Sequence, residues 1–254
     1  MSCTVAKFLG LCVLAFCAAI PTACAKAVNA LVLEQLSKSQ GKTTAYITPD
    51  AVRIVNQAIG YVIIAKAPAW TVFTINDKKK NYFVSEYSNW KPPAILGVDY
   101  CTGGAHWTKV GSERIAGFNV DKCEVEGAKR DKVGNEEIPR SGVYWMANDA
   151  AVPARIADLL ALYFGVDCLH KLPVRFKAIP VSFDESMDRH PQVMMFLDTL
   201  SAHKAPVDTA VFELPKGHKR VVLDADVRMS RKTPKLLNNM LKDLDPIYGR
   251  GGRP

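Results

Sequence analysis

A regular series of short runs rich in β-forming residues, between residues 43 and 87, most constrains what this chain can fold into. The runs are rich in Val, Ile, Thr, Tyr and Trp, and turn signals such as Pro49-Asp50 and Asn76-Asp77 separate them. Their spacing of about 8–12 residues leaves no room for a helix between strands, so it predicts an antiparallel meander and not βαβ units. The predicted strands are Thr43–Thr48, Ala51–Asn56, Tyr61–Lys66, Trp70–Asn76 and Tyr82–Tyr87.

Further strands are expected in the second half of the chain. Residues 90–97 carry Pro92-Pro93 and are expected to form an irregular crossing segment. The polar residues 127–140 are expected to form a loop, and residues 182–191 an acidic loop. The predicted strands are Thr108–Ile115, Phe118–Val125, Gly142–Met146, Leu172–Ile179, Val193–Ala202 and Ala210–Leu214.

Three helices are predicted. Apolar residues recur at helical spacing within residues 27–39, which predicts a short amphipathic helix there. A central helix is expected over Pro153–Phe164 and is followed by Gly165, in agreement with the preference for Pro at the start of helices and Gly just after their end. A last short helix is expected over residues 234–244, followed by a basic tail.

The N-terminal 25 residues have the pattern of a secretory signal. Lys7 supplies the positive charge, residues 8–20 are apolar, and Ala23-Cys24-Ala25 fits a cleavage site. We therefore expect a periplasmic or secreted protein. One alternative is a buried N-terminal helix. Another is a lipid anchor on Cys24, although Pro21 stands where such sites usually have Leu.

Outside this segment the chain keeps Cys101, Cys123 and Cys168. In an oxidising compartment a disulfide is the ordinary expectation. A Cys101–Cys123 bridge would close a loop of about 22 residues and contribute about 3 kcal/mol. Cys168 would then be a buried free thiol. The alternative is that all three thiols are reduced and buried.

Three local motifs resemble one family in their order along the chain. Residues 111–118 (GSERIAGF) form a Gly-x-Glu-x-Ile-Ala-Gly-Phe hairpin, residues 172–175 read LPVR, and residues 212–218 read FELPKGH. Together they are similar to the LolA-like superfamily of periplasmic lipoprotein carriers and cover about residues 27–225. The chain departs from the family pattern in residues 127–140 and in a longer basic tail.

The resemblance implies a fold that is α+β but mainly β. A curved antiparallel sheet would form an incomplete β-barrel covered by two or three helices. No Pro/Gly/Ser-rich linker divides the chain, so we expect one domain over residues 26–233 and a C-terminal helix and basic tail over residues 234–254.

The apolar strand faces must be covered, because large exposed apolar patches favour association. The central helix has an apolar stripe suited to this role. Inside a half-barrel, bulky side chains either leave a cavity for an apolar ligand or fill the space. The residues expected to line such a cavity are Trp70, Val72, Phe73, Ile75, Phe83, Ile156 and Leu160.

No pattern of catalysis is present. The sequence has neither a Gly-x-Ser-x-Gly elbow nor a phosphate-binding glycine loop. Cys168 and His170 are two residues apart. On one strand they would share a face but lack the in-line geometry that a nucleophile and its base need. The set Cys101, His106 and Cys123 lacks metal-ligand spacing, so no metal and no cofactor are expected. Asp184, Glu185, Asp188 and His190 are expected to lie in a solvated acidic loop. Two alternatives for these side chains are a weak cation site and the active site of a hydrolase that acts on envelope polymers.

The formal net charge is +8, and basic residues concentrate toward the C-terminus. In an exported protein such a region suits an anionic membrane or envelope surface better than nucleic acid, or it simply solvates the surface. We therefore expect a non-enzymatic binding protein that holds a lipid, an acyl chain or another apolar ligand in its half-barrel. The alternative is an envelope interaction or sensor module on the same fold without a ligand cavity.

Overall fold

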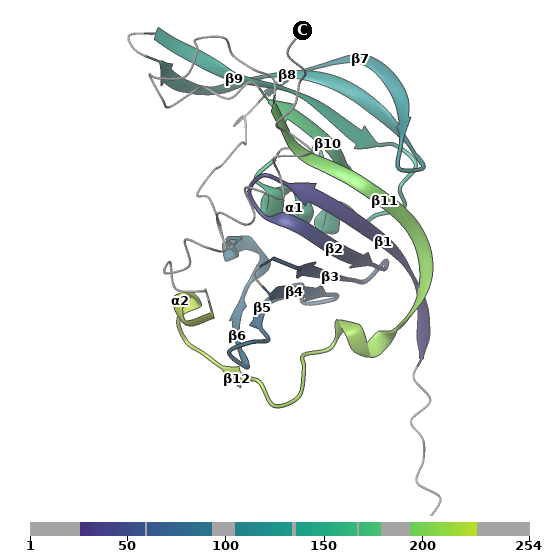
Figure 1. The fold of residues 1–254 in the computed structure, drawn as a ribbon, viewed down its shortest axis with the longest axis vertical. Coiled ribbons are helices and arrows are strands. Elements are labelled where there is room, and N and C mark those ends of the chain that lie inside the picture. Colours follow the sequence, from purple (N-terminus) through teal and green to yellow (C-terminus); the bar gives the residue numbers. More distant parts are fainter. Residues whose placement is uncertain are drawn as a thin grey trace, which may run out of the picture.

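The computed structural model describes residues 26–58, 60–92, 105–133, 136–166, 168–178 and 194–227. All its strands belong to one 12-stranded sheet with the order β12-β6-β5-β4-β3-β2-β1-β11-β10-β9-β8-β7. The sheet is strongly curved and its two ends do not pair with each other (Figure 1). The expected mainly-β α+β class and the curved, open sheet are thus confirmed.

The first half of the sheet is a meander of antiparallel neighbours. Short turns join its strands. The second and third predicted strands match the observed ones, the fourth differs by one residue, and the first and fifth differ by up to two residues. The β-forming residues and the turn signals were therefore sufficient to predict these strands. The strands are β1 (Ala27–Ser37), β2 (Gly41–Ile47), β3 (Ala51–Asn56), β4 (Tyr61–Lys66), β5 (Thr71–Asn76) and β6 (Asn81–Ser85).

The second half continues the sheet beyond β1. The long strand β11 pairs antiparallel with both β1 and β10, so it joins the two halves. A two-residue strand, β12, runs parallel to β6 at the other end of the sheet. The strands are β7 (Ala105–Ile115), β8 (Phe118–Val133), β9 (Glu136–Ala147), β10 (Pro173–Ala178), β11 (Met194–Asp208) and β12 (Lys219–Arg220).

Helices are few among the described residues. Helix α1 (Ala154–Phe164) begins after Pro153, and Gly165 ends it with a left-handed φ of 69°, as predicted. The others are a single turn, α2 (Asp224–Val227), and two 3₁₀ turns, η1 (Tyr87–Asn89) and η2 (Thr209–Phe212). No helix in the described ranges has the length and apolar character needed to span a bilayer.

The prediction of a helix over residues 27–39 was wrong, because this segment forms β1. Both faces of β1 are buried, so its apolar residues do not alternate with polar ones. Ala30 and Val32 point to one face and Leu33 to the other, and all three are buried. A short apolar run buried on both faces has no clear periodicity, so it can be mistaken for a helix.

Two other assignments need correction. Residues 127–140, expected as a loop, extend β8 and β9 into a long hairpin whose backbone ladder reaches Val133 and Glu136. Residues 210–214, expected as a strand, mostly form η2, which starts where the Asp208 carboxylate accepts a hydrogen bond of 2.8 Å from the Ala210 amide. This capping bond favours a turn over an extended chain.

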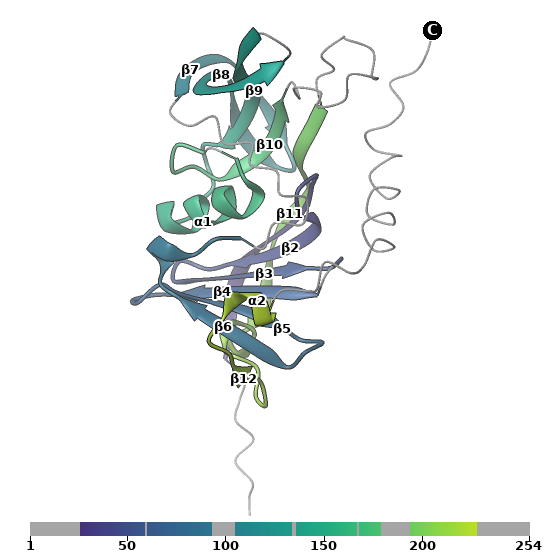
Figure 2. The ribbon, with the colours of Figure 1, turned by 90° about the vertical axis from the view of Figure 1, so that its left-hand side faces the viewer.

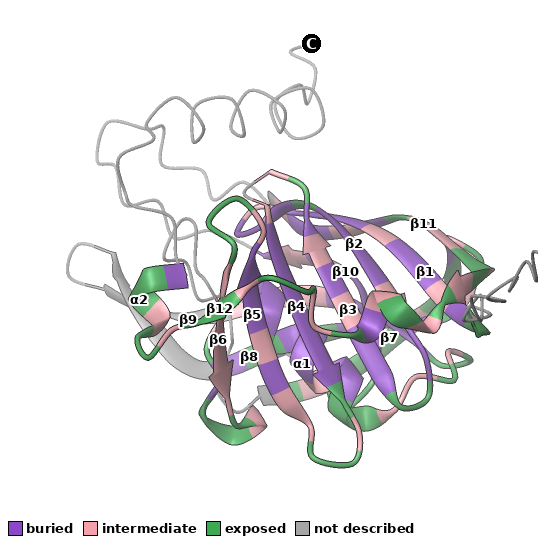
Figure 3. Ribbon diagram, turned by 90° about the horizontal axis from the view of Figure 1, so that it is seen from below, coloured by how far each residue is buried: buried purple, intermediate pink, exposed green. Residues whose placement is uncertain are grey.

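The sheet has an inner face, which packs against α1, and an outer face. The main core combines side chains from β1–β5 and β7–β11 with those of α1, and buried positions concentrate there (Figure 3). Figure 2 shows α1 within the curve of the sheet. On the outer face, smaller apolar clusters lie over β1 to β6 under residues 207–214.

Several expectations lie outside the described residues. These are the signal segment with Cys24, the acidic loop over residues 182–191, Cys101, and residues 234–254. The compartment and the domain limits likewise stay predictions.

Candidate functional site

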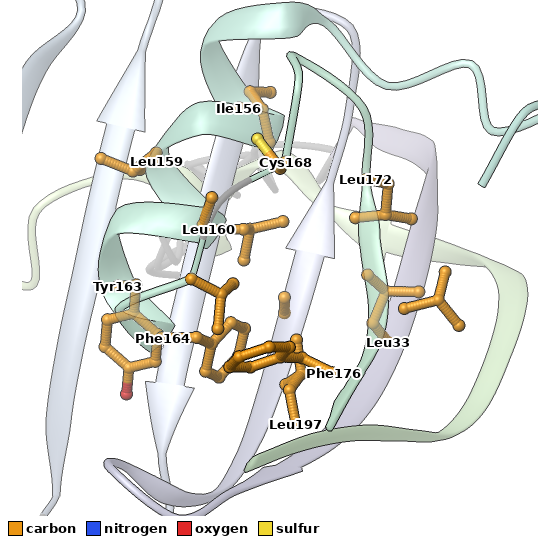
Figure 4. Close-up of a cluster of buried hydrophobic side chains, with 14 of the residues drawn as sticks. Leu33, Ile156, Leu159, Leu160, Tyr163, Phe164, Cys168, Leu172, Phe176 and Leu197 are labelled. Atoms are coloured by element: carbon orange, nitrogen blue, oxygen red, sulfur yellow. The ribbon is translucent and has the colours of Figure 1, made fainter. Parts of the chain in front are cut away.

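The candidate site is the inner face of the sheet together with α1. Seven residues of this eleven-residue helix are buried, since its apolar stripe faces the sheet. Ile156, Leu160 and Phe164 lie along this stripe, close to sheet residues such as Leu33 and Phe176 (Figure 4). Burial of such a stripe gives a short helix most of its stability.

The C-terminal end of α1 is fixed by side chains from the meander. The last carbonyls of a helix have no partner within it, so they need outside donors. Ser39 Oγ donates to the Phe164 carbonyl at 3.0 Å, and Gln40 Nε2 donates to the Tyr163 carbonyl at 3.0 Å. Asn56 Nδ2 donates to the Tyr163 hydroxyl oxygen at 3.0 Å. Burial raises the pKa of Tyr163, so this hydroxyl stays neutral.

The N-terminal end of α1 has fewer such contacts. Pro153 occupies the N-cap position, where no side chain caps the helix, and the first turn has no acidic residue. The Tyr87 hydroxyl donates to the Arg155 carbonyl at 2.8 Å, and the Arg155 guanidinium lies 6.0 Å from the Tyr87 ring centre. Burial, followed by the nearby Asp158 charge, raises the pKa of Tyr87 to about 12. The last turn of α1 thus has more side-chain hydrogen bonds to its backbone than the first turn has.

The structure brings four of the seven predicted lining residues together. Trp70, Val72, Ile156 and Leu160 all belong to the main core between the sheet and α1. Val72, Ile156 and Leu160 are fully buried, while Trp70 is partly exposed at the margin.

The other three predicted residues lie elsewhere. Phe73 and Ile75 point to the outer face, because side chains alternate along a strand and Val72 occupies the inner face. Phe83 lies at the β6 edge in a small cluster with Tyr61 and Val227. The expectation that all seven line one cavity is thus corrected.

Sequence reasoning missed a row of aromatic rings on the inner face. Trp107 on β7, Tyr144 on β9, Phe176 on β10 and Phe196 on β11 follow one another with ring centres 5.1, 4.1 and 5.7 Å apart. Three of the rings are buried and Trp107 is partly exposed. These residues are far apart in the sequence, and only the strand register aligns them.

A charged cluster lies beside this row. The buried Asp121 carboxylate on β8 forms an ion pair with the Lys109 ammonium on β7. Lys171 Nζ lies 3.4 Å from Asp121 Oδ2, and Ser112 Oγ donates to Asp121 Oδ1 at 3.2 Å. Hydrogen bonds from Lys109 and then Asn148 hold the pKa of Asp121 well below its usual range, although burial opposes them. Asp121 is therefore ionised at neutral pH.

The described cysteines do not form a nucleophilic site. Cys168 Sγ donates to Asp158 Oδ1 at 3.5 Å, and His170 Nδ1 lies 2.8 Å from Asp158 Oδ2. Burial, followed by the Asp158 charge, raises the pKa of the Cys168 thiol to about 12, so almost no thiolate forms at neutral pH. These residues do not form a metal site either, because no group of three or more His, Cys, Asp or Glu side chains in the described ranges could hold a metal ion.

Cys123 is a buried free thiol, and burial raises its pKa. Its expected partner, Cys101, lies outside the described residues, so the proposed bridge stays a prediction.

Comparison with protein families and with curated proteins found no match. Among solved structures, the chain is similar to an uncharacterized conserved protein from Thermus thermophilus, with 10% identity and a TM-score of 0.40 over 76% of this chain and 90% of that one. It is also similar to a LolA superfamily protein from Nitrosomonas europaea, with 10% identity and a TM-score of 0.24 over 75% and 91% of the two chains. A LolA superfamily protein, the family that the sequence motifs resemble, is thus among the solved structures found. Both likenesses are distant, so the proposals below rest on the geometry of this chain.

Proposed function

We propose that this chain is an exported, non-enzymatic binding protein that holds an acyl chain or a similar apolar ligand between the inner face of its sheet and α1. The observation that carries the proposal is the unequal attachment of α1. Its C-terminal end is bound by Ser39, Gln40 and Asn56, whereas no side chain caps its N-terminal end. The helix can therefore lift at its N-terminal end while its last turn stays attached.

The interior that such a movement would open is suited to an apolar ligand. Ile156 and Leu160 would separate from Val72 and Trp70, all members of one apolar cluster. A ligand chain would replace the contacts of the helix, at about 0.8 kcal/mol for each CH₂ group removed from water. The helix would then serve as the cover of an unclosed sheet.

The second candidate is an envelope interaction or sensor module. It is favoured by the complete burial of Val72, Ile156 and Leu160, because α1 itself already fills this part of the inner face. The two candidates differ in whether lipid copurifies with the protein.

Two measurements test the binding proposal. Native mass spectrometry of protein purified from its own envelope should reveal a bound lipid, and the delipidated protein should bind a fluorescent fatty acid. A lipid-free protein that also ignores the fluorescent fatty acid would refute ligand binding and favour the interaction module.

A matched pair of variants locates the ligand. Val72 and Val62 are both fully buried, but Val72 faces α1 and Val62 faces the outer side of the sheet. Val72→Ala and Val62→Ala should each lower the free energy of unfolding by about 2 kcal/mol. Only the space left at Val72 can be filled by the ligand, so only V72A should bind the fluorescent fatty acid more tightly, by roughly fourfold for one extra buried CH₂ group. Equal affinities in the two variants would place the ligand elsewhere.

A further inference from the structure

The charged cluster on the inner face lies directly beside the apolar row. In the strand register Lys109 on β7 pairs with Cys123 on β8, Cys123 with Tyr144 on β9, and Tyr144 with Phe176 on β10. Paired residues in antiparallel strands point to the same face. The Lys109 side chain therefore continues the line of the Tyr144 and Phe176 rings.

The same cluster also lies next to the start of α1. Lys171 Nζ donates to Asn148 Oδ1 at 3.0 Å, and Asn148 belongs to the segment that leads into the helix. The Asn148 amide donates to the Asn119 carbonyl at 2.9 Å, which attaches this segment to the start of β8. Lys171 thus contacts the segment that leads into α1.

The charge of the cluster is positive. Two ammonium groups, Lys109 and Lys171, share the single buried carboxylate of Asp121. Roughly half of each lysine side chain is exposed, at 57% and 43%, whereas only 13% of the Asp121 side chain is exposed. The carboxylate therefore positions the two lysines while their outer surfaces stay available to an anion.

Building on the binding function proposed above, we propose that Lys109 and Lys171 bind the head group of the ligand, which is an amphiphile with a single-chain apolar tail and an anionic oxygen head, a carboxylate or a phosphate. The tail enters along Tyr144 and Phe176 toward α1, and the head stays at the partly exposed lysines. Asp121 is a positioning residue that sets the net charge.

The test uses displacement of an uncharged fluorescent acyl probe from the full-length protein by three ligands with the same chain: dodecanoate, dodecyl phosphate and dodecanol. The unmodified protein should prefer the two anions to the alcohol by roughly tenfold, since a hydrogen bond to a charged group is stronger than one to a neutral group. Lys109→Gln and Lys171→Gln should remove most of this preference and leave dodecanol affinity unchanged. Lys122→Gln is the control, because Lys122 lies on the same strand as Asp121 and Cys123 but near the Trp145 ring, with its ammonium 5.5 Å from the ring centre.

Asp121→Asn should change anion affinity in the opposite direction from the two lysine variants. Removing the carboxylate makes the cluster more positive, so anion affinity should rise several-fold while dodecanol affinity stays the same. This variant keeps the test valid even where a lysine variant folds poorly.

The outcomes separate the two proposals. Equal binding of acid and alcohol by the unmodified protein would overturn the head-group site but not ligand binding. Binding of none of the three would overturn both. If inorganic phosphate at the same concentration also displaced the probe, the two lysines would bind a free anion, and the head-group site would be overturned. A preference for either anion that the lysine variants lose would support it and identify the head chemistry.

Discussion

At the scale of single residues, Gly142 allows the aromatic row to form. A Cβ atom at this position would overlap Phe176 Cε2 and lie 2.8 Å from the Lys177 carbonyl oxygen. Gly142 therefore lets the Phe176 ring lie flat against β9, where it stacks on Tyr144 with ring centres 4.1 Å apart. A glycine inside a strand commonly marks such a close approach.

Gly142→Ala should consequently lower the free energy of unfolding by about 1–3 kcal/mol, because a well-packed core tolerates added volume poorly. Gly111→Ala is the matched control: Gly111 also lies within a strand, β7, and a Cβ atom there would meet nothing within 4 Å. Its effect should stay within about 0.5 kcal/mol. Urea denaturation of both variants measures the difference, and equal midpoints would show that the row can shift to accept a methyl group.

At the scale of secondary-structure elements, the attachment of the last turn of α1 can be tested separately from its packing. Gln40 is buried and its amide donates to the Tyr163 carbonyl. Gln40→Ala leaves this carbonyl without its donor, so the free energy of unfolding should fall by about 1–2 kcal/mol and the amides of α1 should exchange faster. Gln57→Ala is the control, since Gln57 is exposed and donates to Thr44 Oγ1 at 2.9 Å. Equal exchange rates in α1 for both variants would show that apolar packing alone holds the helix.

Elements differ in how well the sequence predicts them. Residues 51–56 and 61–66 were assigned to strands with the correct bounds, because strong turn signals flank them. Residues 27–37 were not, because a strand buried on both faces loses the alternation that identifies it. For the site, the expected lining was partly wrong because it grouped Val72 with Phe73, and neighbours on one strand point to opposite faces. The aromatic row and the Asp121 cluster needed the register of β7 to β11, which no local pattern contains.

At the scale of the whole molecule, the two ends of the sheet do not pair with each other, and residues 209–214 cover part of its outer face. Phe212 packs on Ala30 and Ala51 of the outer face. The chain then pairs with β6 through β12 and continues into α2, where the Val227 carbonyl accepts a hydrogen bond of 2.8 Å from Asn76 Nδ2. Residues 209–227, which we call the strap, therefore pass around the edge strand β6. An unpaired strand at this edge would favour association with other chains.

Phe212→Ala tests whether the strap stabilises the sheet or only lies on it. The loss of a buried aromatic ring should lower the free energy of unfolding by about 3 kcal/mol, at the low end for core phenylalanines because this cluster is small. Val222→Ala in the same strap is the control, since Val222 is 89% exposed and should change stability by less than about 0.5 kcal/mol. Amide exchange shows which strands are affected. If the strap stabilises the sheet, amides in both β3 and β6 should exchange faster when Phe212 is truncated. Faster exchange confined to residues 209–227 would instead show that the meander is stable without its strap, and that the curvature of the sheet is set by α1 and the inner core alone.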